Sequence, residues 1–180
     1  MLHSSGNSEL YYYCTKEVKV IIRQILAKDI ETILELNEIS VKVLSPMDKS
    51  KLLRLIEMSA LSIVVEEADQ VAGFLLAFTD NVEYESINYK WFNKNYDSFL
   101  YIDRIVISEK FRGKGGASKL YKYALDWATD HSLATIFAEI DVMPANEPSL
   151  LFHQKWGFKE LELLKHNENK IVSLQALSIS

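Results

Sequence analysis

Residues 108–117 read SEKFRGKGGA and are the most informative segment of the chain. Its three glycines, at positions 113, 115 and 116, let backbone N–H groups approach a ligand without interference from a Cβ atom. An apolar segment at 99–107 predicts a strand before the stretch. Apolar residues at spacings of three and four predict a helix after it, to about residue 131. Such a unit aims unpaired N–H groups and the positive end of the helix dipole at one spot.

The local charge of this unit differs from that of the whole chain. Residues 109–122 contain five cations and one anion, a net charge of +4, whereas the 180-residue chain carries −5. A positive island on an acidic protein favours a bound phosphate group over general binding to nucleic acid. The glycines fit neither common nucleotide motif. No Lys-Ser or Lys-Thr pair follows the last glycine, and Ser118 stands where a dinucleotide turn requires its third glycine.

Strand and helix patterns alternate along the rest of the chain, which predicts one α/β (α+β) domain with a mixed sheet over residues 18–180. Strands are expected at 18–26, 60–66, 70–79, 99–107, 133–142, 158–164 and 171–177. Further helices are expected after the cap Asp29, from Pro46 onward, and from Asn146 to Trp156. The first 17 residues show no clear period and are expected to form a loose arm.

Composition restricts the function classes. The chain is 48% apolar and 25% charged, which is typical of a globular domain. Its single cysteine, Cys14, excludes an internal disulfide and a multi-cysteine metal site. The histidines at 3, 131 and 166 lack ligand spacing, so no metal is predicted. There is no apolar run of membrane-spanning length and no signal-peptide pattern at the start, so we expect a cytoplasmic protein without a membrane partner.

The glycine turn resembles the cofactor loop of the GNAT superfamily of N-acetyltransferases. That loop reads Arg-x-x-Gly-x-Gly/Ala, and Arg112, Gly115 and Ala117 match it. The strand before it commonly reads Ile/Leu-x-Val/Ile in the family, and Ile105-Val106-Ile107 is similar. The resemblance implies a mixed, mostly antiparallel central sheet that is flanked by helices. Two of its strands, one ending near 108 and one beginning near 133, would splay apart.

A second motif strengthens the resemblance. The family pattern Asn-x-x-Ser/Ala, followed by an aromatic helix and Gly-Phe, is matched by Asn146, Ser149, Phe152 and Gly157-Phe158. The resemblance implies that acetyl-coenzyme A (acetyl-CoA) is the cosubstrate and binds in the splayed opening. Its pantetheine arm would pair with the strand, and its pyrophosphate would lie on the loop amides. The residues implied in this binding are Ile105, Val106, Ile107, Arg112, Gly113, Lys114, Gly115, Gly116, Ala117, Ser118, Asn146 and Ser149. Asn146 and Ser149 are also good helix-capping residues, and capping is the alternative role for both.

The reaction implied is direct transfer of the acetyl group to a primary amine of a small molecule or a protein. It requires a base for the amine and an acid for the departing thiolate. Many family members have a tyrosine acid seven residues after the motif asparagine. Here His153 stands there, and it can either donate a proton near neutral pH or be structural.

Three carboxylates are candidates for the base. Glu139 and Asp141 share one face of the strand at 133–142, and Asp103 lies on the preceding strand. Carboxylates that oppose each other across the opening would raise one another's pKa. Each can instead pair with an arginine or a lysine as an ordinary strand charge, and water can also carry the proton.

The acceptor surface is the least specified part. The resemblance places it at residues 40–50 and at seven aromatic residues in the segment 84–101, which can line a cleft or fill the core. Cys14 is far in sequence from every motif, which argues against an acetyl-cysteine intermediate. The missing tyrosine favours the alternative of a non-catalytic acyl-CoA-binding or sensing module. A homodimer is compatible with the sequence.

Overall fold

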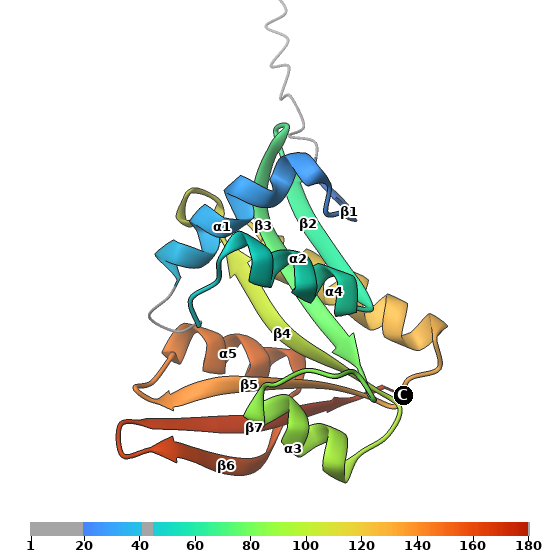
Figure 1. Cartoon of the computed structure of the whole chain (residues 1–180), viewed down its shortest axis with the longest axis vertical. Coiled ribbons are helices and arrows are strands. Elements are labelled where there is room, and N and C mark those ends of the chain that lie inside the picture. The colour runs from blue at the N-terminus through green and yellow to red at the C-terminus, as the bar shows by residue number, and fades with distance from the viewer. Residues whose placement is uncertain (1–19, 41–44, 180) are drawn as a thin grey trace, which may run out of the picture.

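The computed structural model describes residues 20–40 and 45–179 (Figure 1). The predicted arm at 1–17, including Cys14, lies outside the described residues. One seven-stranded sheet runs in the order β1-β2-β3-β4-β5-β7-β6. Its strands are β1 (Val20–Gln24), β2 (Leu61–Glu67), β3 (Gln70–Thr79), β4 (Phe99–Ile107), β5 (Thr135–Met143), β6 (Lys159–Asn167) and β7 (Lys170–Ser178).

Five α-helices and two short 3-10 turns belong to the described residues. The helices are α1 (Ile30–Ile39), α2 (Lys49–Met58), α3 (Ile87–Asn95), α4 (Gly116–Asp130) and α5 (Glu147–Trp156), and the turns are η1 (Ala27–Asp29) and η2 (Glu109–Phe111). The prediction that Pro46 opens the second helix is wrong by three residues. That helix begins at Lys49, because the Asp48 side chain accepts a hydrogen bond from the Lys51 N–H at 2.7 Å and caps it.

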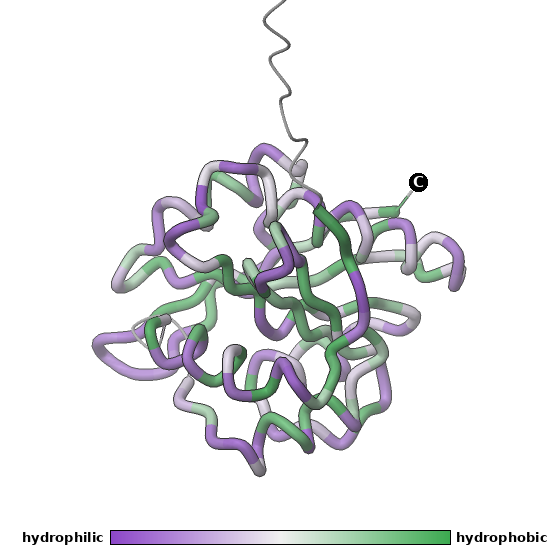
Figure 2. The backbone as a smooth tube through the Cα atoms, turned by 90° about the horizontal axis from the view of Figure 1, so that it is seen from above, coloured by the Kyte–Doolittle hydropathy of each residue, from purple (hydrophilic) through white to green (hydrophobic). Residues whose placement is uncertain are grey.

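The helices cover the two faces of the sheet and bury two hydrophobic clusters. One cluster packs α1, α2 and α3 against one face, and the other packs α4 and α5 against the opposite face. Figure 2 shows hydrophobic residues concentrated in the central layer and hydrophilic residues along the outer loops. In α4 the buried positions Leu120, Tyr121, Ala124 and Ala128 fall on one side of the helix, as the apolar spacing predicts.

The sheet is splayed between β4 and β5, as the resemblance implies. These two strands form the parallel pair of the sheet, and the other neighbouring strands are antiparallel. The parallel pairing extends only from Phe99 opposite Thr135 to Ile102 opposite Ala138. Beyond this point the two strands fan apart (Figure 1). The backbone of β4 from Asp103 onward therefore has a free edge toward β5.

The aromatic segment mainly fills the core. Tyr89, Phe92, Phe99 and Tyr101 are fully buried, and the ring of Phe92 stacks on Phe137 of β5 with 4.4 Å between centroids. Helix α3 forms within this segment because Ser86 caps it, accepting a hydrogen bond from the Tyr89 N–H at 3.3 Å. The sequence leaves open whether the aromatic residues line a cleft or fill the core. These four rings fill the core.

Gly73 in β3 lies where a side chain has no room. An added Cβ would collide with the backbone oxygen of Val106 and would lie 2.6 Å from Cδ1 of Ile107. We expect Gly73→Ala to lower the free energy of unfolding by about 2–4 kcal/mol, because the backbone of β4 must move to accommodate it. Urea denaturation measures this loss. Gly116→Ala is the control, since its Cβ would make an ordinary contact at 3.5 Å. Equal stability of the two variants would contradict the prediction.

Candidate functional site

The glycine loop has the backbone that a phosphate group requires. Gly113 and Gly115 have φ values of +76° and +81°, a region that residues with a Cβ rarely adopt. In the part of the chain that the structure describes, no backbone carbonyl accepts from the N–H groups of residues 113–118. Three of these N–H groups belong to the first turn of α4, where the helix dipole is positive. The loop therefore fits a polyanionic cofactor.

The cations of the loop are exposed and only loosely held. Arg112 donates to the Ile107 carbonyl at 3.4 Å and lies 3.7 Å from Glu109, while Lys114 lies 3.4 Å from Glu67. Ion pairs this exposed contribute little to stability. A cavity of about 150 Å³ adjoins the loop, between the end of α1 and the end of β4, and Val106, Ile107 and Arg112 help to line it.

Asn146 and Ser149 lie at the start of α5, just beyond the end of β5. The Asn146 side chain accepts a hydrogen bond from the Ser149 N–H at 3.4 Å, so it caps the helix. This contact is the helix-capping role that the sequence analysis gives as the alternative to cofactor binding. It leaves the amide nitrogen of Asn146 available for a further hydrogen bond.

His153 is buried on the face that α4 and α5 cover, with 3% of the residue exposed. Its Nδ1 lies 2.7 Å from the Ser149 carbonyl oxygen and its Nε2 lies 2.6 Å from the Tyr121 hydroxyl. Because a carbonyl only accepts, Nδ1 carries the proton and Nε2 accepts from Tyr121. Burial lowers the pKa of His153, against a smaller opposite effect of the Ser149 carbonyl. The imidazole is therefore neutral at pH 7 with both nitrogens bonded.

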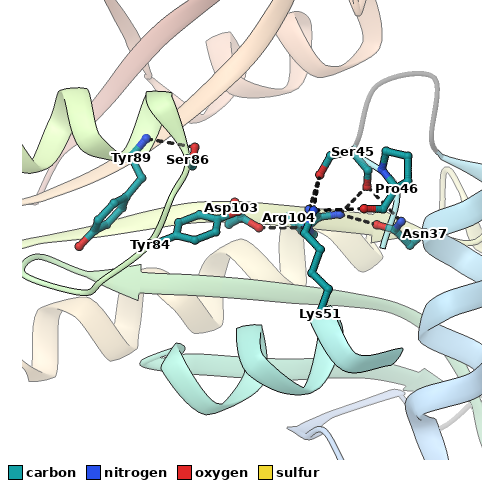
Figure 3. Close-up of polar contacts among 9 residues, drawn as sticks. All are labelled: Asn37, Ser45, Pro46, Lys51, Tyr84, Ser86, Tyr89, Asp103 and Arg104. Carbon is teal, nitrogen blue, oxygen red and sulfur yellow. Dashed lines mark hydrogen bonds and ion pairs between the residues drawn. The ribbon is translucent and has the colours of Figure 1, made fainter. Parts of the chain in front are cut away.

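Asp103 lies on the opposite face, at a β-bulge. Arg104 pairs with Leu76 and Ile102 with Ala77, which leaves Asp103 as the extra residue of β4. Its carboxylate accepts from the Tyr84 hydroxyl at 2.7 Å and from Nε of Arg104 at 3.0 Å (Figure 3). Burial raises the pKa of Asp103, while Arg104 and Tyr84 lower it.

Arg104 joins this carboxylate to the connection between α1 and α2. Its guanidinium donates to Oδ1 of Asn37 at 2.7 Å, to the Ser45 carbonyl at 2.9 Å and to the Ser45 hydroxyl at 2.6 Å (Figure 3). Lys51 donates to the carbonyl of Pro46 at 3.1 Å. Of the predicted acceptor surface at 40–50, residues 41–44 lie outside the described part. Ser45 is thus fixed to Arg104 beside the bulge of β4.

Glu139 follows directly after Ala138, the last residue of β5 that pairs with β4. Its Oε2 is enclosed and has no hydrogen-bond partner among the described residues, and the same holds for the hydroxyl of the buried Tyr101. Burial raises the pKa of Glu139 to about 8, and the charge of Asp103 adds to this effect. The influence of one carboxylate on the other agrees with the sequence prediction. Tyr101 and Asn88 act in the opposite direction.

Asp141 is the least available of the three carboxylates. It is 7% exposed, and its Oδ2 accepts a hydrogen bond from Nζ of Lys170 in β7 at 2.9 Å. This is the ordinary strand ion pair that the sequence leaves open. The structure therefore brings Asp103 and Glu139 together at the point where the strands part, and it pairs Asp141 elsewhere.

The sequence analysis gave no role beside the carboxylates to Tyr84 and Tyr101, which it placed only in the aromatic segment. Tyr101 has a signal in the sequence, since it lies two residues before Asp103 on the same strand. Tyr84 reaches Asp103 only through the path of the chain before α3, which no local pattern encodes. Arg104 is the arginine partner that the sequence analysis leaves open for a carboxylate, and it pairs with Asp103 at 3.0 Å.

The described residues carry neither a membrane-spanning helix nor a cluster of metal ligands. Within 20–40 and 45–179, none of the helices combines the length and the apolar character needed to cross a membrane. The same residues contain no group of three histidine, cysteine or acidic side chains that could hold a metal ion.

Solved structures share this fold. The chain is similar to Ard1 from Thermoplasma volcanium, with 18% identity, a TM-score of 0.73, and coverage of 89% of this chain and 98% of that one. It is similar to yncA from Salmonella typhimurium, which was solved with its cofactor acetyl-CoA, at 17% identity and a TM-score of 0.69, covering 90% and 95%. The ribosomal-protein-S18-alanine N-acetyltransferase of Escherichia coli shows 12% identity and a TM-score of 0.68, covering 90% and 95%.

No curated protein is significantly similar to the chain. The model of the acetyltransferase (GNAT) family, however, matches residues 28–158. This match spans well over half of the chain and includes the splayed strands, the glycine loop and the capped helix α5. The chain therefore belongs to the GNAT acetyltransferase family and is an acyltransferase that uses acetyl-CoA.

Proposed function

We propose that the enzyme transfers the acetyl group of acetyl-CoA directly to a primary amine of a small molecule or a protein. The observation that carries the proposal is the Glu139 carboxyl group. It is enclosed, lacks a hydrogen-bond partner among the described residues at Oε2, and lies where β4 and β5 part. A carboxyl group with a pKa of about 8 is suited to take a proton from an amine near neutral pH.

The two facing carboxylates have different roles in this proposal. Asp103 receives hydrogen bonds from Tyr84 and Arg104, which favour its ionised form. Glu139 has no comparable donors at Oε2 and faces the charge of Asp103, so it is the member that holds the proton at rest. Glu139 must lose that proton to act as the base. We therefore expect turnover to rise with pH, with a midpoint near 8.

Acetyl-CoA supplies an activated acetyl group as a thioester. The loop amides at 113–118 bind its phosphates, as their geometry supports. The free edge of β4 at 105–107 offers N–H groups that stabilise negative charge on a carbonyl oxygen in the gap. Direct attack by the amine needs no protein nucleophile, and Cys14, outside the described residues, has no role in this scheme.

His153 is proposed to act together with Tyr121 at the acid side. The Tyr121 hydroxyl donates a hydrogen bond to Nε2 of His153, so the pair forms a short polar chain on the face that α4 and α5 cover. The charge of Glu139 is close enough to raise the pKa of Tyr121, although burial is the larger cause.

We expect His153→Ala to lower turnover at least tenfold with little change in the affinity for CoA. It should also lower the free energy of unfolding by about 2–4 kcal/mol, because a cavity forms and the Tyr121 hydroxyl loses its partner. Stopped-time assays of thiol release across pH and calorimetry with CoA separate the two effects. An unaltered pH–rate profile would exclude His153 from the proton transfer.

One observation favours a second candidate function, a non-catalytic acyl-CoA-binding module. The position of the family's tyrosine acid holds a histidine whose ring nitrogens are both occupied within the protein. Release of free thiol from acetyl-CoA distinguishes the candidates, with a panel of polyamines, amino acids, aminoglycosides and peptides as acceptors. Amine-dependent release supports the enzyme. Tight binding of acetyl-CoA without release across the panel supports the module.

A further inference from the structure

Arg104 is a buried cation, 3% exposed, that follows the bulge of β4. In a regular strand successive side chains point to opposite faces, but the bulge inserts Asp103 as an extra residue and lets both side chains meet on one face. Nε of Arg104 then donates to Oδ2 of Asp103 at 3.0 Å (Figure 3). A buried charge also needs partners for its other donors, and the guanidinium finds these at α1 and just before α2.

The guanidinium holds both ends of the connection between α1 and α2. Nη1 donates to Oδ1 of Asn37 at 2.7 Å and to the Ser45 carbonyl at 2.9 Å, and Nη2 donates to the Ser45 hydroxyl at 2.6 Å. Asn37 closes the ring, because its Nδ2 donates to the same Ser45 carbonyl at 3.3 Å. Asn37 is fully buried near the end of α1. The position of both ends therefore depends on one side chain of β4.

The cavity beside the glycine loop lies between the two elements that Arg104 joins. Its volume is about 150 Å³, and Ile39 lines it from the end of α1 while Val106 lines it from the end of β4. Asn37 and Arg104 precede these two lining residues closely on the same elements, and their side chains are bonded to each other. Arg104 therefore sets the distance between the two walls of the cavity.

This cavity lies on the face of the sheet that carries the two candidate carboxylates. Its lining residues Leu36 and Val106 belong to the hydrophobic cluster under α1, α2 and α3, and so does Phe137 of β5. Glu139 follows Phe137 at the spacing that keeps two residues on one face of a strand. The glycine loop, by contrast, leads into α4, which packs on the opposite face. An amine that approaches these carboxylates must come from the α1–α3 face.

We propose that the acceptor amine enters through this cavity and that Arg104 is its positioning residue, an inference that rests on the proposed function. Arg104 touches neither substrate. It fixes the end of α1 and Ser45 relative to β4, and so it sets how the amine is presented to the thioester. The apolar residues of the lining favour an amine with a short apolar arm, since a cavity of this volume holds a group about the size of benzene.

The experiment measures steady-state thiol release with benzylamine and with the most active amine of the panel above. Arg104→Met is expected to raise the KM for the amine about tenfold or more, because a small displacement of the walls misplaces the acceptor. The KM for acetyl-CoA should change less than about twofold, since the loop amides at 113–118 are not bonded to Arg104.

Substitutions at Ser45 test the same restraint from its other end. Ser45→Ala removes one acceptor of the guanidinium and should raise the KM for the amine about threefold, whereas Ser45→Thr retains the hydroxyl and should restore it. In the Arg104→Met background, Ser45→Ala should add nothing, since both changes break the same bond. If Arg104→Met does not fold, the comparison of Ser45→Ala with Ser45→Thr still decides, because Ser45 is exposed.

Two matched controls test for unspecific damage. Arg23→Met removes an arginine of β1 that pairs with Asp29 and Glu66, each at 2.6 Å, and has no printed contact with the connection. Ser59→Ala removes a hydroxyl that donates to the Ile56 carbonyl at the far end of α2. Both should leave the KM for the amine unchanged, although Arg23→Met should lower stability.

Amide hydrogen exchange measures the restraint without an acceptor. In Arg104→Met the amides of 37–40 and 45–51 should exchange about tenfold faster or more, and those of β7 should keep their rates. The proposal is overturned if the KM for the amine stays in place in Arg104→Met, if the KM for acetyl-CoA rises instead, or if Arg23→Met has the same effect. Absence of amine-dependent turnover in the wild-type protein rejects the proposed function, and unchanged exchange in Arg104→Met rejects the restraint by itself.

Discussion

Glu139→Gln is expected to reduce amine-dependent thiol release by about two to four orders of magnitude, while acetyl-CoA binds with unchanged affinity. Glutamine has nearly the shape of a protonated glutamate, so the enclosed site keeps its packing but can no longer accept a proton. The residual activity should also lose its rise toward pH 8. Initial rates across pH 6–10 at saturating acetyl-CoA test this expectation.

The same substitution should stabilise the folded chain at alkaline pH. The pKa of Glu139 is about 8 in the folded protein and near its ordinary value of 4.5 in the unfolded chain. Between these values the folded state holds a proton that the unfolded state has released, so stability falls as pH rises from 4.5 to 8. Glutamine cannot ionise. Above pH 8 the variant should therefore be more stable by roughly 2–4 kcal/mol.

Asp141→Asn is the matched control on the same strand. Its carboxylate is already paired with Lys170, so its loss should lower stability and leave the alkaline rise in activity in place. Urea denaturation at pH 6 and pH 9 for the three proteins makes the comparison. A Glu139→Gln variant with wild-type turnover would exclude this residue as the base.

Gly115→Val is expected to weaken the binding of CoA at least a hundredfold while the domain remains folded. At a φ of +81° a β-branched residue is strained, so the loop must adopt another conformation and its amides no longer converge. The space around the position is open, since the nearest atom to an added Cβ is Nζ of Lys119 at 4.0 Å. Calorimetry with CoA and a circular dichroism spectrum measure the two effects.

Gly157→Val serves as the control for backbone strain. Gly157 has a φ of +89° at the C-terminal end of α5, so the strain is similar but lies outside the glycine loop. Both variants should lose about 1–3 kcal/mol of stability, and only Gly115→Val should lose affinity. Unchanged affinity in Gly115→Val would disprove the assignment of the loop to the phosphates.

Local patterns predicted the parts of this molecule that depend on local physics. The glycines specify the turn and the apolar spacing specifies α4, so both elements could be predicted from the sequence. The splay between β4 and β5 followed only from the resemblance, because it depends on how two distant strands pack, and the end of pairing at Ile102 and Ala138 was not predicted. The start of α2 was misplaced because a proline and an aspartate compete as start signals, and the hydrogen bond from Lys51 to Asp48 decides between them.

The site shows the same division more sharply. Glu139 and Asp103 could be named as candidates from strand positions alone. The different environments of the two carboxylates could not be predicted. They arise because Tyr84 and Arg104 donate hydrogen bonds to Asp103, whereas Oε2 of Glu139 has no donor among the described residues. The buried environment of His153 could not be predicted either, because the hydroxyl of Tyr121 contacts His153 only when α4 packs against α5.

The limited pairing between β4 and β5 affects how the protein resists local opening and proteolysis. Four residue pairs join two half-sheets, β1–β4 and β5–β7, and beyond these pairs the two strands are not hydrogen-bonded to each other. A ligand that occupies this opening binds the folded chain and not the unfolded one. A higher ligand concentration therefore lowers the fraction of molecules in which the two half-sheets have separated. Amide hydrogen exchange should therefore slow along both edges as acetyl-CoA rises, and resistance to proteolysis should follow the metabolic state of the cell.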